Sequence, residues 1–302
     1  MLDFQSVKKN ISIFLHHPKC SVESVNGIVR ALSPQYNIKI FTHHAVQDGF
    51  FDDVEMVIYP GGEGDADSFE YLLKENIDAI KIFLSQGGKY LGICMGAYWA
   101  DAYYFDILQD TRVVQYIKRP QADVTHSYGT TVPIRWQGQD NQMYFYDGCC
   151  YTNGEFKTIA TYANGDPMAI IQGSVGLIGC HLESEQSWYL KKNQQPHWHR
   201  GEHHLLLLEF VNALLTTPVQ EAHFPKPVRG EYIDWIRGYL SLLDYVKEHQ
   251  TTNVPHDYID TKGFLLGQWV AAKRQSPHAV DEYQQQKLNS LPHWQWQTPT
   301  VK

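Results

Sequence analysis

The sequence contains no hydrophobic run close to the roughly 20 residues that a membrane-spanning helix needs, so we expect no membrane segment. Its five cysteines show neither a metal-ligand spacing nor a disulfide framework, which favours a reducing compartment and makes the cytoplasm the expected location. Asp3 precedes a short apolar run without a small-residue cleavage site, and the N-terminus therefore predicts a first strand instead of a signal peptide.

Positive charge is also scarce. The 302 residues include 25 Lys and Arg against 33 Asp and Glu, a net charge of −8 at pH 7. Residues 228–302 contain equal numbers of basic and acidic side chains, so the negative excess lies in residues 1–227. An acidic main part argues against contact with nucleic acid there. With 43% hydrophobic residues, the chain has the composition of a globular protein with a substantial core.

Short apolar runs alternate with helical patterns at the start of the chain, which predicts βαβ units on a parallel sheet. Further β-type runs broken by turns predict strands that extend or flank this sheet, before a closing helix. The expected fold class is α/β, a doubly wound, mainly parallel sheet with a small C-terminal all-α helical domain. The predicted strands are residues 11–15, 37–42, 55–59 and 89–93 with shorter runs over 110–180, and the predicted helices are residues 21–32, 68–84 and 203–215.

A proline-rich segment divides the chain. Three prolines and little apolar periodicity mark residues 218–229 as a linker between a main domain, residues 1–217, and a second domain, residues 230–302. Apolar residues at helical spacing follow the linker and predict an amphipathic helix at the start of the second domain.

Cys94 stands between two glycines, Gly92 and Gly96, where a predicted strand passes into a helix. A nucleophile on such a sharp turn is exposed above the sheet on a strained backbone that needs small neighbours. The amide of Met95 would then point at a developing oxyanion. The alternative is a structural cysteine buried at a tight turn, since a free cysteine packs as a small hydrophobe.

Two other strand ends favour the catalytic interpretation. The apolar run before His181 ends in His-Leu-Glu, and a general base needs a carboxylate such as Glu183 to fix its tautomer. The predicted strand at 55–59 ends in Gly61-Gly62, whose backbone amides can complete an oxyanion hole. Each signal alone is weak, but together they supply a nucleophile, a base with its orienting carboxylate, and a glycine turn.

The motifs Pro-Gly-Gly, Gly-x-Cys-x-Gly and His-x-Glu, in this order, resemble the class I glutamine amidotransferases over roughly residues 10–215. Within that superfamily they look closest to the amidotransferase-like domain at the N-terminus of biotin-protein ligases. The resemblance implies a flavodoxin-like amidotransferase fold with a Cys94–His181–Glu183 triad. It also implies an oxyanion hole made by the amides of Gly62 and Met95.

The sequence departs from that family at two positions. Tyr98 replaces the glutamine that usually follows the nucleophile, and Leu182 replaces the proline between the histidine and the glutamate. The substrate is therefore a small-molecule amide that need not be free glutamine, and a γ-glutamyl bond is equally compatible. The resemblance implies no cofactor and no metal. The residues that we expect to contact the substrate are Gly61, Glu63, Tyr98, Ser127 and Tyr128.

The second domain resembles the helicase-associated domain, a small helical module. We expect its aromatic residues to form its core, since so small a bundle has little else to bury. Arg237, Lys273 and Arg274 are candidates for a nucleic-acid contact, although a neutral domain is unlike a DNA-binding one. A protein partner or self-association through residues 230–302 is the other possibility. The matching residues are Trp235, Tyr245, His249, Val254-Pro255, Tyr258, Leu266-Gly267, Trp269-Val270, Trp294 and Trp296.

Four histidines lie within eight residues, His197, His199, His203 and His204. The spacing of His199 and His203 is that of zinc ligands on a helix, but no carboxylate or cysteine matches it. We therefore expect a histidine-rich rim near the active site instead of a metal centre.

The sequence thus leads to two hypotheses of different class. The first is a cysteine-dependent amidotransferase-like hydrolase that forms a thioester on Cys94. The alternative is a non-catalytic amidotransferase-fold binding module, or an adaptor for protein or nucleic acid that acts through its C-terminal domain.

Overall fold

A computed structural model of the chain describes residues 8–16, 19–46, 49–63, 66–190, 193–218, 229–261, 263–275, 277, 280 and 282–296. The chain divides into two compact units, Met1–Phe224 and Pro225–Lys302. The predicted linker, residues 218–229, lies outside the described residues except for its two ends. Within the described residues, no helix is both long and apolar enough to cross a membrane.

The first unit is built on a nine-stranded sheet in the order β2-β1-β3-β4-β11-β10-β9-β6-β7. Strands β2, β1, β3, β4 and β11 pair in parallel, and the remaining neighbours pair antiparallel. Two further strands, β5 and β8, form a small separate sheet. The strands are β1 (Asn10–Phe14), β2 (Asn37–Phe41), β3 (Met56–Tyr59), β4 (Lys89–Ile93), β5 (Arg112–Gln115), β6 (Thr130–Trp136), β7 (Gln139–Phe145), β8 (Cys149–Thr152), β9 (Lys157–Tyr162), β10 (Pro167–Gln172) and β11 (Val175–Ile178).

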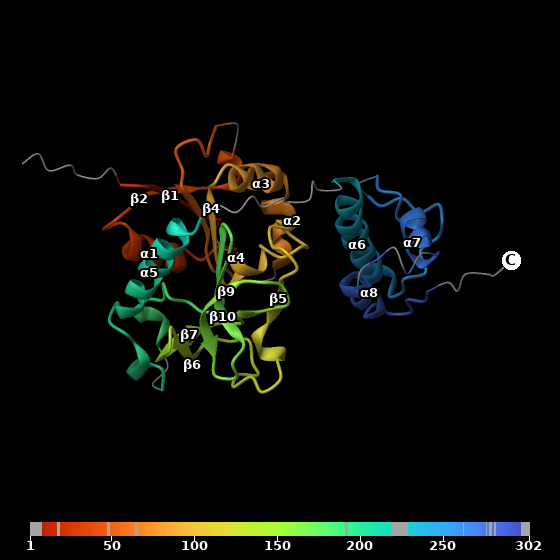
Figure 1. Cartoon of the computed structure of the whole chain (residues 1–302). Helices are drawn as coiled ribbons and strands as arrows, with labels where there is room; N and C mark the ends of the chain where they lie inside the picture. Colours follow the sequence, from red (N-terminus) through yellow and green to blue (C-terminus); the bar gives the residue numbers. More distant parts are fainter. Residues whose placement is uncertain are drawn as a thin grey trace, which may run out of the picture. The chain divides into compact units, whose positions relative to one another are not determined.

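Helices cover both faces of the parallel half of the sheet, as Figure 1 shows. One face packs on α1 (Val22–Leu32) and α5 (Glu202–Thr216), which contact each other. The other packs on α2 (Phe69–Leu72), α3 (Ile77–Ser85) and α4 (Met95–Tyr98). Successive strand residues point to opposite faces, so Ile58 joins the first hydrophobic cluster and Val57 the second. The predicted doubly wound α/β arrangement is confirmed, with an antiparallel extension.

The helix predicted over 68–84 is broken into two. Helix α2 ends at Leu72, the following residue Leu73 has a non-helical φ of −128°, and a 3₁₀ turn at Lys74–Asn76 precedes α3. The buried Asn76 side chain donates a hydrogen bond to the carbonyl oxygen of His43, at 3.3 Å, and so anchors this turn to the end of β2. A tertiary contact of this kind outweighs helix propensity over so few residues.

The second unit contains α6 (Arg229–His249), α7 (Leu266–Gln275) and α8 (Glu282–Asn289). The aromatic core predicted from the sequence is confirmed, because Trp235, Tyr245 and Trp269 are buried together with aliphatic residues of the three helices. Trp294 and Trp296 pack against this cluster and are partly buried.

The junction of β3, β4 and α4 depends on close backbone approach at Gly96. A Cβ atom at this position would lie 1.9 Å from the carbonyl oxygen of Tyr59, at the end of β3. A contact this short with backbone can be relieved only by moving the strand or the helix.

We expect Gly96→Ala to lower the free energy of unfolding by about 3 kcal/mol, because the added methyl overpacks a backbone contact. Gly138→Ala is the matched control, since a Cβ there meets nothing within 4 Å and only the positive φ of 88° opposes it. That strain costs about 1 kcal/mol. Denaturant unfolding of both variants measures the difference, and equal losses would contradict the steric explanation.

Candidate active site

Cys94 lies at the end of β4 on a strained backbone. Its φ of 51° and ψ of −105° are unusual for a residue with a side chain, and such conformations cluster at functional sites. The side chain is 5% exposed, and its thiol donates to the carbonyl oxygen of Tyr146 with an Sγ–O distance of 3.4 Å. The sharp strand-to-helix turn predicted from the two flanking glycines is therefore present. The helix that follows, α4, is a single turn.

The two glycines of the motif are required by packing. A Cβ on Gly92 would lie 2.4 Å from the carbonyl oxygen of Gly96, and Gly96 itself lies against Tyr59. The amide of Gly96 donates to the carbonyl oxygen of Pro60 at 3.3 Å. The turn that carries Cys94 is thus held directly against the end of β3.

His181 and Glu183 follow β11, the strand beside β4. The Nδ1 atom of His181 lies 2.9 Å from Oε1 of Glu183, and both side chains are buried. The other ring nitrogen, Nε2, is buried and has no hydrogen-bond partner of ordinary geometry among the described residues. The imidazole is therefore fixed by the carboxylate on one side and has its second nitrogen free for proton transfer.

Opposing influences act on the pKa of His181. Burial alone would lower this pKa, but the Glu183 carboxylate and, after it, negative charge on Cys94 raise it to about 10. An imidazolium is consequently the favoured form of His181 at neutral pH in this environment. Cys94 thus interacts electrostatically with His181.

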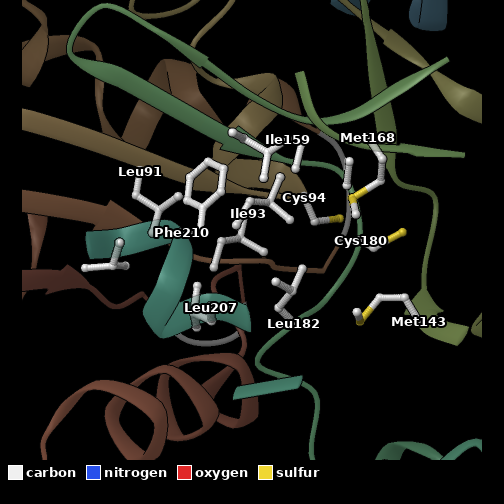
Figure 2. Packing of buried hydrophobic residues seen from close by; sticks show 14 of the residues in the cluster. Leu91, Ile93, Cys94, Met143, Ile159, Met168, Cys180, Leu182, Leu207 and Phe210 are labelled. Carbon is white, nitrogen blue, oxygen red and sulfur yellow. The ribbon is translucent and has the colours of Figure 1, made fainter. Parts of the chain in front are cut away.

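The other four cysteines are structural. All five cysteines are free, and burial is the largest cause that raises the pKa of Cys20, Cys149, Cys150 and Cys180, that of Cys150 to about 12. These groups remain thiols at neutral pH. Figure 2 shows Cys94 and Cys180 in the same hydrophobic cluster as Ile93 and Leu182.

Aromatic rings from two segments flank His181. The ring of Tyr144, in β7, lies 6.0 Å from the imidazole, and that of Trp188 lies 5.2 Å away, both edge-on. The carbonyl oxygen of Tyr144 accepts a hydrogen bond from the amide of His181, at 3.0 Å. The sequence did not predict either residue at the site. Nothing in the strand pattern of residues 139–145 distinguishes Tyr144 from its neighbours.

Tyr98 was predicted to contact substrate. In the structure its hydroxyl donates to the carbonyl oxygen of Asp147 at 3.2 Å, and the Asp147 carboxylate accepts from the Gln115 side chain. Because Tyr146 precedes Asp147, Tyr98 anchors the same turn that contacts the Cys94 thiol. Its observed contact thus holds the β7–β8 turn against the Cys94 thiol.

The glycine turn after β3 adjoins the catalytic candidates. A Cβ on Gly61 would lie 2.6 Å from Cε1 of His181, and one on Gly62 would lie 3.0 Å from the sulfur of Met95. Among the described residues, no hydrogen bond engages the amides of Gly62 or Met95. The amides of these two predicted oxyanion-hole donors are therefore not engaged by another group among the described residues, and the Met95 side chain lies against Gly62.

The remaining predicted substrate residues lie at the surface. Glu63, Ser127 and Tyr128 are exposed, and Tyr128 stacks on His126 with ring centroids 3.7 Å apart. The next residue, Gly129, has room for no side chain because a Cβ would lie 2.1 Å from the Tyr144 hydroxyl. Gly129 thus lies against the Tyr144 side chain, whose ring adjoins His181.

A groove of about 550 Å³ lies elsewhere, on the antiparallel edge of the sheet. No predicted site residue lines it, and it plays no part in the site described above. Its lining residues are Pro133, Ile134, Arg135, Asp140, Asn141, Gln142, Thr161, Tyr162, Ala163 and Gly165.

Three of the four clustered histidines are buried, near Ser184, the residue that follows Glu183. His199 Nδ1 accepts hydrogen bonds from the amides of Gly201 and His203, at 3.1 and 3.3 Å, at the start of α5. Its Nε2 lies 3.4 Å from the Ser184 hydroxyl, and His204 Nε2 lies 3.2 Å from the Ser184 carbonyl oxygen. The cluster therefore supports the loop that carries Glu183. No group of three or more potential ligands in the described part of the chain is arranged to hold a metal ion.

Two of the three candidates for a nucleic-acid contact, Lys273 and Arg274, make contacts within the second unit. Arg274 donates to the backbone and side chain of Thr252, at 3.0 and 3.2 Å, and lies over the ring of Trp294. Lys273 lies 5.8 Å from the ring centroids of Trp235 and Trp269. The side chain of Arg237 lies outside the described residues. These contacts assign structural roles to Lys273 and Arg274.

The buried histidines make stability depend on pH. Burial and neighbouring histidines lower the pKa of His199 to about 3 and that of His203 to about 4. The unfolded chain binds these protons near pH 6.5, so the stabilisation is complete above that pH and is lost as pH falls toward 4. We expect His203→Leu to reduce the loss of unfolding free energy between pH 7 and pH 5 by about 2 kcal/mol. Urea unfolding of the wild type and the variant at both pH values measures this. An equal loss of unfolding free energy in the two proteins would contradict it.

Comparison with known proteins finds similarity to two families. A family model described as "Biotin-protein ligase, N terminal" matches residues 15–114, and one described as "Helicase associated domain" matches residues 233–297. No curated protein matches the chain.

Solved structures are similar in fold. A glutamine amidotransferase from Thermotoga maritima is 11% identical, with 69% of this chain and 98% of that chain covered and a TM-score of 0.50. A glutamine amido transferase from Methylobacillus flagellatus is 13% identical, with coverage of 71% and 96% and a TM-score of 0.45. At these identities the likeness concerns the fold alone, and the assignment of the fold rests on the first structure. The chain thus combines a unit with the glutamine amidotransferase fold, similar over residues 15–114 to the N-terminal domain of biotin-protein ligases, with a second unit that is similar over residues 233–297 to the helicase-associated domain.

Proposed function

We propose that the first unit is a cysteine-dependent hydrolase that cleaves a glutamine-like or other small-molecule amide through a thioester on Cys94. The observation that carries this proposal is the pairing of His181 with Glu183 at 2.9 Å after β11, while the neighbouring strand β4 ends in a cysteine held at a φ of 51°. Neither feature is needed for a buried structural cysteine. The other four cysteines have neither a positive φ nor an effect on a paired histidine.

The reaction proceeds in two halves. The Cys94 thiolate attacks the amide carbonyl carbon, a carbon–sulfur bond forms, and the carbonyl electrons move to oxygen. His181 gives its proton to the nitrogen, so that the carbon–nitrogen bond breaks and ammonia or an amine leaves. Neutral His181 then removes a proton from water, which attacks the thioester, and the carboxylic acid is released as the Cys94 thiolate leaves.

The tetrahedral intermediate carries an oxyanion in both halves. We assign its stabilisation to the amides of Gly62 and Met95, because no other described group occupies them. Such donors contribute a large part of catalysis in acyl transfer, since they are preorganised where negative charge develops. Glu183 keeps its charge throughout and holds the His181 cation that forms or persists between steps.

The proposal restricts the substrate to an amide but does not select one amide. Tyr98 occupies the place where amidotransferases carry a glutamine, and its hydroxyl donates a hydrogen bond to the carbonyl oxygen of Asp147. A γ-glutamyl bond or another amide therefore fits the proposal as well as free glutamine does. The five free cysteines are those expected in a reducing compartment, and we infer a cytoplasmic protein.

The reactivity of Cys94 tests the proposal directly. We expect iodoacetamide at pH 7 to give a single rapid adduct on Cys94, because burial keeps the other four cysteines as thiols. Loss of the charged partner in His181→Ala should slow this adduct by about a hundredfold. Intact-protein mass against time measures both rates, and an electrophilic glutamine analogue in parallel reports whether the pocket accepts a glutamine shape.

Two control variants make the result specific. Cys149→Ala should keep the rapid adduct and Cys94→Ala should lose it, while His249→Ala, in the second unit, should react as the wild type does. If Cys94 reacts no faster than the other thiols, or equally fast without His181, the hydrolase proposal is wrong. The alternative of a non-catalytic binding module with an accessory C-terminal unit would then take its place.

A further inference from the structure

Ser24 connects helix α1 to the proposed triad. It lies in the first turn of the helix, and its side chain is fully buried. Its hydroxyl donates to Oε1 of Glu183 at 2.7 Å and accepts from the amide of Gly61 at 3.2 Å. A single side chain thus touches both the carboxylate that orients His181 and the glycine turn beside the oxyanion donors.

The start of α1 holds Gly61 from two sides. Ser21, the N-cap residue, donates its amide hydrogen to the carbonyl oxygen of Gly61 at 3.1 Å, and its side chain accepts from the amide of Ser24. Because the Gly61 amide is occupied by Ser24, the next amide, that of Gly62, is the one left to face an oxyanion. The two serines therefore fix the orientation of the peptide that precedes the oxyanion donor.

The carboxylate of Glu183 has few other partners. Within the described residues, Oε1 receives hydrogen bonds from His181 and Ser24, whereas Oε2 is buried without a partner. Helix α1 also contacts the Glu183 backbone, since a Cβ on Gly27 would lie 1.9 Å from its carbonyl oxygen. A buried carboxylate with only two donors depends strongly on each for its orientation.

We propose that Ser24 is a positioning residue of the active site, which holds Glu183 against His181 and the Gly61 peptide beside the oxyanion donors. This inference rests on the proposed function. Ser24 touches neither the nucleophile nor the reacting atoms, so it acts through Glu183 and Gly61. Its hydroxyl, and not its bulk, carries the role.

The experiment measures the rate of iodoacetamide reaction at Cys94 in the full-length chain. We expect Ser24→Ala to slow this rate about tenfold, because a charged carboxylate loses one of its two hydrogen bonds. Ser12→Ala is the matched control, since Ser12 is equally buried in β1 and its hydroxyl has no partner among the described residues. Ser12→Ala should change the rate less than about twofold.

A second background separates positioning from general destabilisation. If Ser24 acts through the charge of Glu183, then Ser24→Ala should have less than about a twofold effect in a Glu183→Gln chain, where that charge is already absent. Ser24→Thr, which keeps the hydroxyl, should react faster than Ser24→Val, which has the same shape without it. If Ser24→Ala does not fold, the comparison of Ser24→Thr with Ser24→Val still tests whether the hydroxyl carries the role.

The outcomes distinguish this inference from the function on which it rests. A wild-type Cys94 that reacts no faster than the one in His181→Ala removes the proposed function itself. A fast, His181-dependent wild type with an unchanged Ser24→Ala overturns only the role of Ser24. Equal losses from Ser24→Ala in the wild-type and Glu183→Gln backgrounds would show that the serine merely supports the fold.

Discussion

The site depends on the parallel pairing of β11 with β4. In this register Ile178 lies opposite Ile93, and the amide of Cys94 donates to the carbonyl oxygen of Ile178 at 2.9 Å. Parallel strands end at the same edge of a sheet, so residues that follow β4 and β11 emerge side by side. Cys94 comes directly after the first strand and His181 shortly after the second. The long antiparallel excursion between them returns the chain to this position. On its way it supplies Tyr144, in β7, beside His181 and Tyr146, in the turn after β7, beside Cys94.

Burial of a carboxylate is the second constraint, and it explains the local chemistry. Glu183 is fully buried, and a carboxylate removed from water is stable only with donors or a cation beside it. His181 and Ser24 supply these contacts. The same charge raises the pKa of His181, although burial of the imidazole opposes it. The requirement to stabilise Glu183 therefore also prepares the histidine to hold a proton beside Cys94.

The sequence predicted what depends on local pattern and chain order. Alternating strands and helices, the glycines around Cys94 and the His-x-Glu motif all express constraints within a few residues, and the parallel sheet then brings them to one edge. Ser24 was missed because its hydrogen bond spans 159 positions in sequence, and a serine in the first turn of a helix has a sufficient local explanation. The interrupted helix before α3 was missed for the same reason, since Asn76 bonds to His43 across 33 positions.

The two departures from the amidotransferase pattern have a common physical meaning. Leu182, where the family has a proline, is fully buried in the cluster that contains Cys94, so burial anchors the loop that a proline ring would otherwise stiffen. Tyr98, in place of a glutamine, anchors the turn above the Cys94 thiol. Both side chains stabilise the backbone around the proposed nucleophile. Under the proposed function, discrimination between amides then falls to residues outside these two positions. Gly129, next to the exposed residues Ser127 and Tyr128, lies against the Tyr144 hydroxyl, and the Tyr144 ring adjoins His181, so we propose this segment as a further substrate contact.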